Sequence, residues 1–133
     1  MSESKYDKYF TRDIIRDGEL APFLPRVKFN SRKNFGTGNF GLRFAYVTEP
    51  FEIPEGSHAH DFEQYLCFFG TPGNVREFDA EVELFLGEEN ERRIITESTV
   101  VHIPVGMIHC PLRFTRVNKP IIFINSVLTD RYA

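Results

Sequence analysis

Residues 40–46 read Phe-Gly-Leu-Arg-Phe-Ala-Tyr, so large apolar side chains occupy every second position. Successive side chains of a β-strand point to opposite faces, and this spacing therefore predicts a half-buried strand. The same two-residue period runs through 26–30 and 80–86. In the latter segment Glu81 and Glu83 share the polar face, which we expect to lie on the solvated outside of the sheet.

Further strands are expected in four segments rich in apolar residues. These segments are Phe62–Phe69, Thr99–Ile103, Leu112–Val117 and Ile121–Val127. Turns containing Gly, Pro or Asn separate them, and no convincing amphipathic helix appears between residues 26 and 127. So many short strands predict an all-β fold of the sandwich, jelly-roll or barrel type.

The N-terminal segment differs from the rest of the chain, and we interpret 1–25 as an arm followed by a single domain over 26–133. Tyr6, Tyr9 and Phe10 follow helical spacing, which predicts a short helix or an ordered arm. A partly mobile terminus is the alternative.

The amino-acid composition limits which classes of protein this chain can belong to. The 133 residues are 41% apolar and 26% charged, enough for a folded core. A net charge of −3 without a basic block argues against a nucleic-acid partner. No apolar run approaches the roughly 20 residues of a membrane span, and no secretory signal is visible. Cys67 and Cys110 are too few for a disulfide scaffold, so we expect a cytoplasmic protein.

One glycine-rich stretch resembles a nucleotide-binding fingerprint in its spacing alone. Gly36–Gly41 matches the pattern G-x-G-x-x-G. That fingerprint works when the glycines open a helix, whereas an alternating strand follows here. We therefore interpret the stretch as a turn and expect no nucleotide cofactor.

The histidines carry the clearest chemical signal. His58 and His60 lie two residues apart, so on a strand both project from one face and can bind one metal ion. The same parity brings Gln64 to that face and turns Glu63 away, unless a bulge intervenes. Farther along the chain, a Pro-Val-Gly turn presents His109 at the start of the next expected strand.

These two stretches resemble the two motifs of the cupin family. The first motif reads H-x-H, three or four residues, Glu, six residues, Gly. The second reads P-x-G, two residues, His, three residues, Asn. This chain supplies the histidines of both motifs, together with Gly70, Pro104 and Gly106. It departs from the pattern at Arg113, where the motif has Asn.

The resemblance implies a jelly-roll, or double-stranded β-helix, barrel of the small single-domain, conserved-barrel kind. It also implies one divalent metal ion inside the cavity, held by His58, His60 and His109. Parity favours Gln64 as the fourth ligand, with Glu63 as the alternative because it keeps the motif's spacing to the glycine. Three nitrogens and one oxygen suit Fe, Mn, Ni, Cu or Zn.

Such a site predicts a small metal-dependent enzyme of the dioxygenase, isomerase, lyase or decarboxylase type, acting on a small organic molecule. A non-catalytic module that binds a small ligand or metal, for sensing, storage or an accessory role, is one alternative; a structural barrel without metal is another. Arg113, which shares nominal parity with His109, and Tyr46 are candidate cavity residues, although Arg113 also suits a surface ion pair. We interpret His102 as a core or surface histidine rather than a ligand.

The sheet edges of a jelly roll suggest self-association. An exposed edge strand is commonly covered by pairing with a second copy of the chain. The charged N-terminal arm could also pack on a partner barrel. We therefore expect a homodimer.

Overall fold

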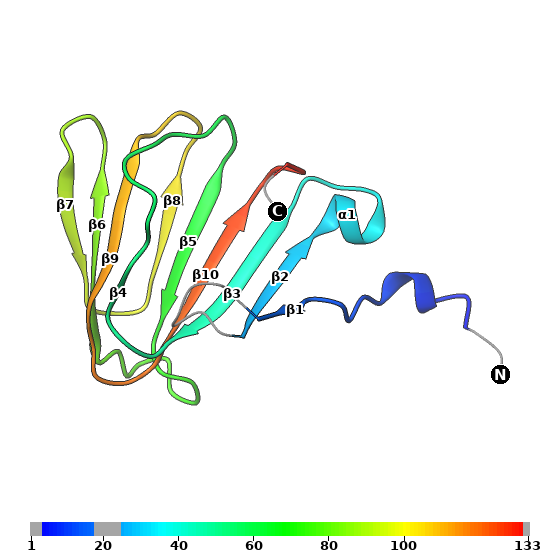
Figure 1. Ribbon diagram of the computed structural model, residues 1–133, viewed down its shortest axis with the longest axis horizontal. Helices are drawn as coiled ribbons and strands as arrows, with labels where there is room; N and C mark the ends of the chain where they lie inside the picture. Colours follow the sequence, from blue (N-terminus) through cyan, green and yellow to red (C-terminus); the bar gives the residue numbers. More distant parts are fainter. Residues whose placement is uncertain (1–3, 18–24, 132–133) are drawn as a thin grey trace.

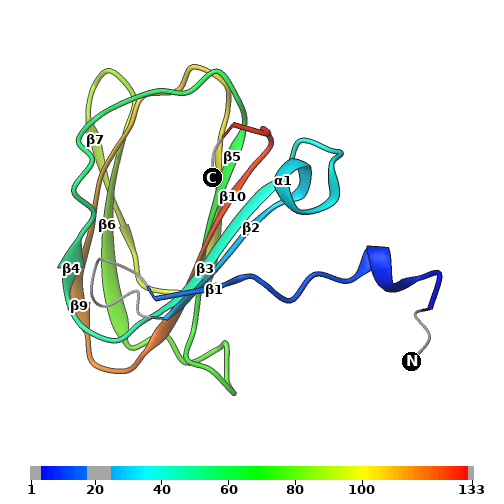
Figure 2. The same cartoon turned by 45° about the vertical axis from the view of Figure 1, so that its right-hand side comes forward.

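The computed structural model describes residues 4–17 and 25–131, whose regular secondary structure is almost entirely antiparallel strand. Figure 1 and, more clearly, Figure 2 show two sheets that face each other. One has the strand order β1-β2-β3-β10-β5-β8, and the other β4-β9-β6-β7. The strands are β1 (Ile15–Arg16), β2 (Arg26–Asn30), β3 (Gly41–Val47), β4 (Phe51–Glu52), β5 (Gln64–Phe69), β6 (Ala80–Leu86), β7 (Glu91–Ile95), β8 (Thr99–Ile103), β9 (His109–Val117) and β10 (Ile121–Val127). The expected all-β class is confirmed.

Two five-residue elements, strand β7 and a short helix, were not expected from the sequence. Strand β7 has no alternating apolar pattern of its own, and it joins the smaller sheet because its backbone pairs with that of β6. A five-residue helix, α1 (Ser31–Phe35), lies where none was expected. The Asn30 side chain accepts a hydrogen bond from the backbone of Lys33, and Gly36 ends the helix at a φ of 75°. Local capping, rather than an apolar stripe, therefore explains α1. No helix in the described part of the chain is long and apolar enough to span a membrane.

The segment expected as an arm is partly joined to the sheet. A 3-10 turn, η1 (Asp7–Tyr9), is followed by β1, whose Ile15 pairs with Val27 of β2. Figure 1 shows the chain before β1 leading away from the barrel. The part of the arm expectation that concerns residues 1–3 and 18–24 falls outside the described residues.

The core between the sheets is centred on three phenylalanines. Phe68 of β5, Phe114 of β9 and Phe123 of β10 have ring centroids 5.2–6.1 Å apart. Phe68 and Phe114 are almost fully buried. Burying side chains of this size contributes about 1.5–3 kcal/mol each, so the cluster stabilises the contact between the two sheets.

The inward face of β3 is the opposite of the one that its large apolar side chains suggest. Ala45 and Val47 are buried, whereas Tyr46 is 47% exposed and stacks edge-on against Phe44. Neighbouring strands continue this outward side in register. We call it the outer apolar face, and it comprises Val27, Phe29, Leu42, Phe44, Tyr46, Ile122 and Ile124. Because the core is already filled, these residues cover the outside of the larger sheet.

Candidate metal centre

Three histidines from two distant stretches meet at one end of the barrel. The ligand atoms of His58, His60 and His109 all lie within 4.8 Å of one another. Two nitrogens bonded to one ion at about 2.1 Å can be no more than about 4.2 Å apart. Side-chain shifts of well under about 1 Å therefore bring all three imidazoles to a shared ion.

Backbone hydrogen bonds hold these histidines in place. His58 and His109 form an isolated antiparallel bridge, with N–H···O distances of 3.1 and 2.9 Å. The carbonyl of His60 accepts a hydrogen bond from the backbone of Gly106 at 2.8 Å. Gly106 has a φ of 81°, a conformation that glycine adopts without strain. The turn expected before His109 therefore also positions the loop that carries His60.

Carbonyl oxygens set the orientation of two of the rings. Nδ1 of His58 lies 2.6 Å from the carbonyl oxygen of Gly56, and Nδ1 of His109 lies 2.9 Å from that of Met107. Because a carbonyl oxygen only accepts hydrogen bonds, Nδ1 carries the proton in both rings. In this tautomer of the neutral ring, Nε2 is the nitrogen whose lone pair is available to a metal.

Burial favours the neutral form of His60 and His109. Desolvation, and then the neighbouring His58, hold the pKa of His60 below its usual value. Desolvation also lowers the pKa of His109, against the opposing effect of the Met107 carbonyl. A neutral imidazole is the form that binds a metal, so both rings are ready to bind near pH 7.

Gln64 is the polar side chain from β5 that reaches the same region. It is buried, and its Nε2 donates a hydrogen bond to Oδ1 of Asn125 at 2.8 Å. This bond identifies Oε1 as the free end of the amide. Oε1 of Gln64 and Nε2 of His109 are both buried without a hydrogen-bond partner among the described residues. Two lone pairs without donors are what a bound cation would satisfy.

Glu63 lies outside this group. Its carboxylate pairs with Nε2 of His102 at 2.8 Å, and both side chains are substantially exposed. The His102 ring also stacks on Tyr65. The strand parity used in the sequence interpretation holds here: Gln64 points inward and Glu63 outward. His102, interpreted as a non-ligand, takes no part in the histidine group.

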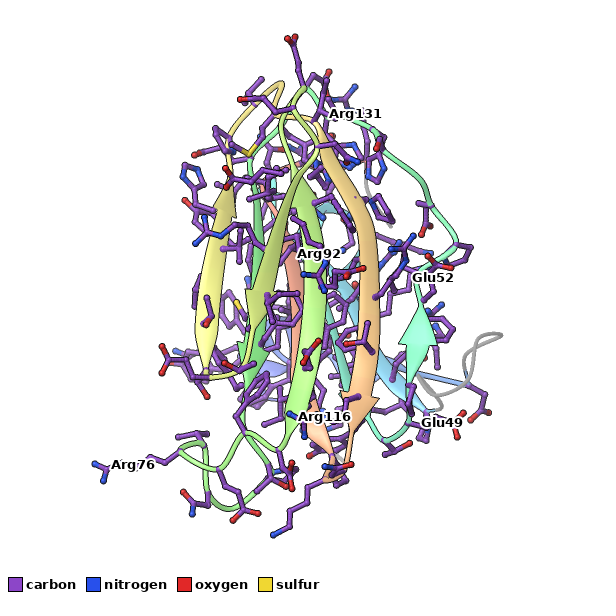
Figure 3. The ribbon with its side chains drawn as sticks, turned by 90° about the vertical axis from the view of Figure 1, so that its left-hand side faces the viewer. Glu49, Glu52, Arg76, Arg92, Arg116 and Arg131 are labelled. Carbon is purple, nitrogen blue, oxygen red and sulfur yellow. The ribbon has the colours of Figure 1, made fainter. Side chains whose placement is uncertain are left out.

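The two candidate cavity residues do not reach the site. Tyr46 lies on the outer apolar face. Arg113 forms ion pairs with Glu52 and Glu83 on the outside of the smaller sheet. Figure 3 views this sheet from outside, with Glu52 and Arg92 labelled. Glu83 lies on this outer face as expected, although the arginines cover it.

A bulge explains why the parity count from His109 to Arg113 is wrong. His109 lies opposite Leu86 and Leu112 opposite Leu84, so β9 has one more residue than β6 over this span. Cys110 adopts a φ of 78° within it. The extra residue reverses the alternation, so that His109 and Leu112 both point inward and Arg113 points outward.

A cavity of about 120 Å³ adjoins the histidines. Its polar lining residues are Arg26, Arg43, Glu55, His58, Gln64, His109 and Asn125. Sequence reasoning missed both arginines, because the large apolar side chains of 26–30 and 40–46, rather than the residues between them, were expected to face inward. Asn125 could have been found, since it is a polar residue at an inward position of the apolar segment 121–127.

Comparisons with known proteins agree with this architecture. No protein-family model matches the chain, and no curated protein matches it either. A solved structure of oxalate oxidase with the substrate analogue glycolate has a TM-score of 0.62 at 13% identity, and covers 100% of this chain and 65% of that one. Recombinant oxalate oxidase with glycolate gives 0.60 at 12%, with 96% and 62% covered.

Oxalate decarboxylase of Bacillus subtilis, which has Mn(II) centres, has a TM-score of 0.52 at 10% identity. The match covers 82% of this chain and 26% of the decarboxylase. This chain therefore spans about two thirds of the oxidase and about a quarter of the decarboxylase. Both enzymes are cupin proteins, and the similarity confirms the jelly-roll fold that the two histidine motifs implied.

Proposed function

We propose that this chain forms a metal-dependent enzyme domain of the cupin type, which acts on a small organic molecule. One divalent ion would be held by His58, His60, His109 and Gln64. The observation that carries the proposal is the convergence of three histidine ligand atoms within 4.8 Å.

The donor set fits a divalent transition metal. Neutral imidazoles and an amide oxygen are ligands that Mn, Fe, Ni, Cu and Zn accept. The carbonyls of Gly56 and Met107 orient two of the rings, as carbonyls commonly do behind metal-ligating histidines. When bound, the ion supplies Lewis-acid or redox chemistry to an organic molecule beside it. Mn is a natural first probe, because the similar decarboxylase has Mn(II) centres.

The cavity beside the histidines favours a small substrate. Its volume of about 120 Å³ is close to that of cavities that hold a single benzene-sized molecule. Apolar side chains from both sheets, among them Leu66, Leu112 and Phe123, complete its lining. The hydrogen bond between Gln64 and Asn125 fixes the amide that faces the cavity.

One observation favours the alternative of a non-catalytic module that binds a small ligand or metal. Among the described residues that line the cavity, Glu55 is the one carboxylate, and it is exposed. Burial, followed by the charge of Glu55, raises the pKa of the Cys110 thiol to about 11, which keeps this thiol neutral. Few side chains are therefore placed for general acid–base catalysis.

The test has two stages. Protein purified without chelator is first analysed for metal content, and then assayed for oxygen consumption and for turnover of a panel of small organic substrates. Turnover that is lost in a His60→Ala variant and retained in a His102→Ala variant supports the enzyme. Both variants lose one imidazole, but His102 lies outside the histidine group.

The other outcomes are equally informative. Retained metal and tight ligand binding without turnover across the panel would favour the binding module. Absence of stoichiometric metal after reloading with each candidate ion, together with no ligand binding across the panel, would overturn both readings and leave a structural barrel.

A further inference from the structure

Basic side chains lie on the inner face of the sheet that also carries Gln64. Arg43 of β3 faces Lys28 of β2 in the strand register, and Arg26 lies two residues before Lys28 on the same face. Arg26 and Arg43 line the same cavity as His58 and His109. Guanidinium groups and imidazoles therefore share one enclosed space.

The guanidinium of Arg26 lacks an acceptor within the described structure. Its Nε is buried and has no hydrogen-bond partner there. No ion pair joins Arg26 or Lys28 to a carboxylate in residues 4–17 and 25–131. A buried donor of this kind is destabilising unless something accepts from it.

Among the described residues around the cavity, basic side chains outnumber acidic ones. Burial, and then the charges of Arg43 and Arg26, hold the pKa of Lys28 below its usual value. Glu55 is the one acid among the described lining residues. It is exposed, whereas Arg26 and Arg43 are half-buried, so water screens the negative charge more than the positive ones.

We propose that this cavity takes a small organic anion whose carboxylate is held by Arg26, with Arg43 adding positive charge, while its other end faces His58 and His109. The inference rests on the proposed function for the role of the histidines, and names the class of substrate for that same site. A guanidinium presents its N–H groups as a planar fork that matches the two oxygens of a carboxylate.

The cavity size limits the anion to a few non-hydrogen atoms. Malonate is a suitable probe, and malonamide is its matched control, because the two have nearly the same shape but malonamide carries no charge. Binding is measured by titration calorimetry on the full chain, first stripped with chelator and dialysed, and then reloaded with Mn²⁺. The stripped protein tests the arginines without any contribution from a metal.

Malonate is expected to bind the stripped protein at least tenfold more tightly than malonamide. An Arg26→Gln variant is expected to bind malonate at least tenfold more weakly than the wild type, a difference of about 1.4 kcal/mol. The matched control is Arg76→Gln, which removes the same charge from the loop between β5 and β6, none of whose residues line the cavity. Figure 3 shows the Arg76 side chain projecting away from the barrel. The affinity of this control variant for malonate should equal that of the wild type.

A smaller difference in either comparison would overturn the proposal, as would an equal loss of affinity in Arg76→Gln. The malonate and malonamide comparison needs only the wild type, so it stands even if Arg26→Gln does not fold. Failure of the proposed function has a different signature. The protein would then hold none of the candidate ions after reloading with each, while the preference of the stripped protein for malonate would persist.

Discussion

Replacing His60 by alanine is expected to remove most of the stabilisation that Mn²⁺ confers on this protein. A ligand that binds only the folded state, at 100 times its dissociation constant, stabilises that state by about 2.7 kcal/mol. An unfolding entropy of about 2.1 cal/mol/K per residue gives about 0.28 kcal/mol/K for the 133 residues. The wild-type unfolding midpoint should therefore rise by about 10 °C.

The variant keeps two of the three imidazoles. We expect loss of the third to weaken Mn²⁺ binding at least about 100-fold, since even residues behind the ligands change affinity by about 10- to 100-fold. The same Mn²⁺ concentration then about equals the dissociation constant, and the stabilisation falls to about 0.4 kcal/mol. The expected rise in midpoint is about 1–2 °C.

Differential scanning fluorimetry measures this effect directly. Each protein is melted with and without Mn²⁺, so any damage that the substitution does to the metal-free fold cancels in the difference. His102→Ala is the matched control and should keep the full rise, because His102 pairs with Glu63 outside the histidine group. A rise for His60→Ala that equals the wild-type rise would refute the assignment of His60 as a ligand.

Three further predictions concern pH, the core and assembly. Hydrogen bonds from Arg113 and then Arg92 hold the pKa of Glu83 below its usual value of 4.5. Its carboxylate therefore contributes stability that is present above pH 4.5 and is lost as the pH falls through the folded-state pKa. Glu83→Gln should accordingly lower the free energy of unfolding at pH 7, and the gap from the wild type should close below pH 4.5; urea titrations that show a constant gap would contradict this. Phe114→Ala should cost about 3–5 kcal/mol in the same assay, because it empties the centre of the aromatic cluster, and a cost under about 1 kcal/mol would show that the cluster is not the core. The outer apolar face and the arm that leads away from the barrel predict a homodimer in light scattering, and Tyr46→Asp should make it monomeric. A wild type that is monomeric at micromolar concentration would rule out this assembly.

Strand alternation and turn residues were enough to predict the fold class. The expected segments 80–86, 99–103 and 121–127 match β6, β8 and β10 in their bounds. The pattern is local, since each strand alternates whatever lies next to it. The two histidine stretches were also recognisable locally, because two ligands two residues apart and a Pro-Gly turn before a third histidine need no knowledge of the partner strands.

Which face of each strand points into the core could be determined only from the tertiary structure. In β3 both faces carry apolar side chains, and alternation cannot say which of them meets the opposite sheet. The small Ala45 and the fully buried Val47 point inward, while Phe44 and Tyr46 remain outside. Strand β7 depended equally on context, since its pairing with β6 outweighs its weak pattern.

The sequence alone therefore determined an all-β chain with three histidines able to share a metal, because period and motif spacing are properties of consecutive residues. Only the tertiary structure decided which other side chains join them. The bulge at Cys110 turns Arg113 outward, and the inward face of β3 brings Arg43 to the cavity beside Arg26. The physical reason is that the residue pattern of a strand does not by itself say which of its two faces will be buried. Packing against strands far away in the chain decides this.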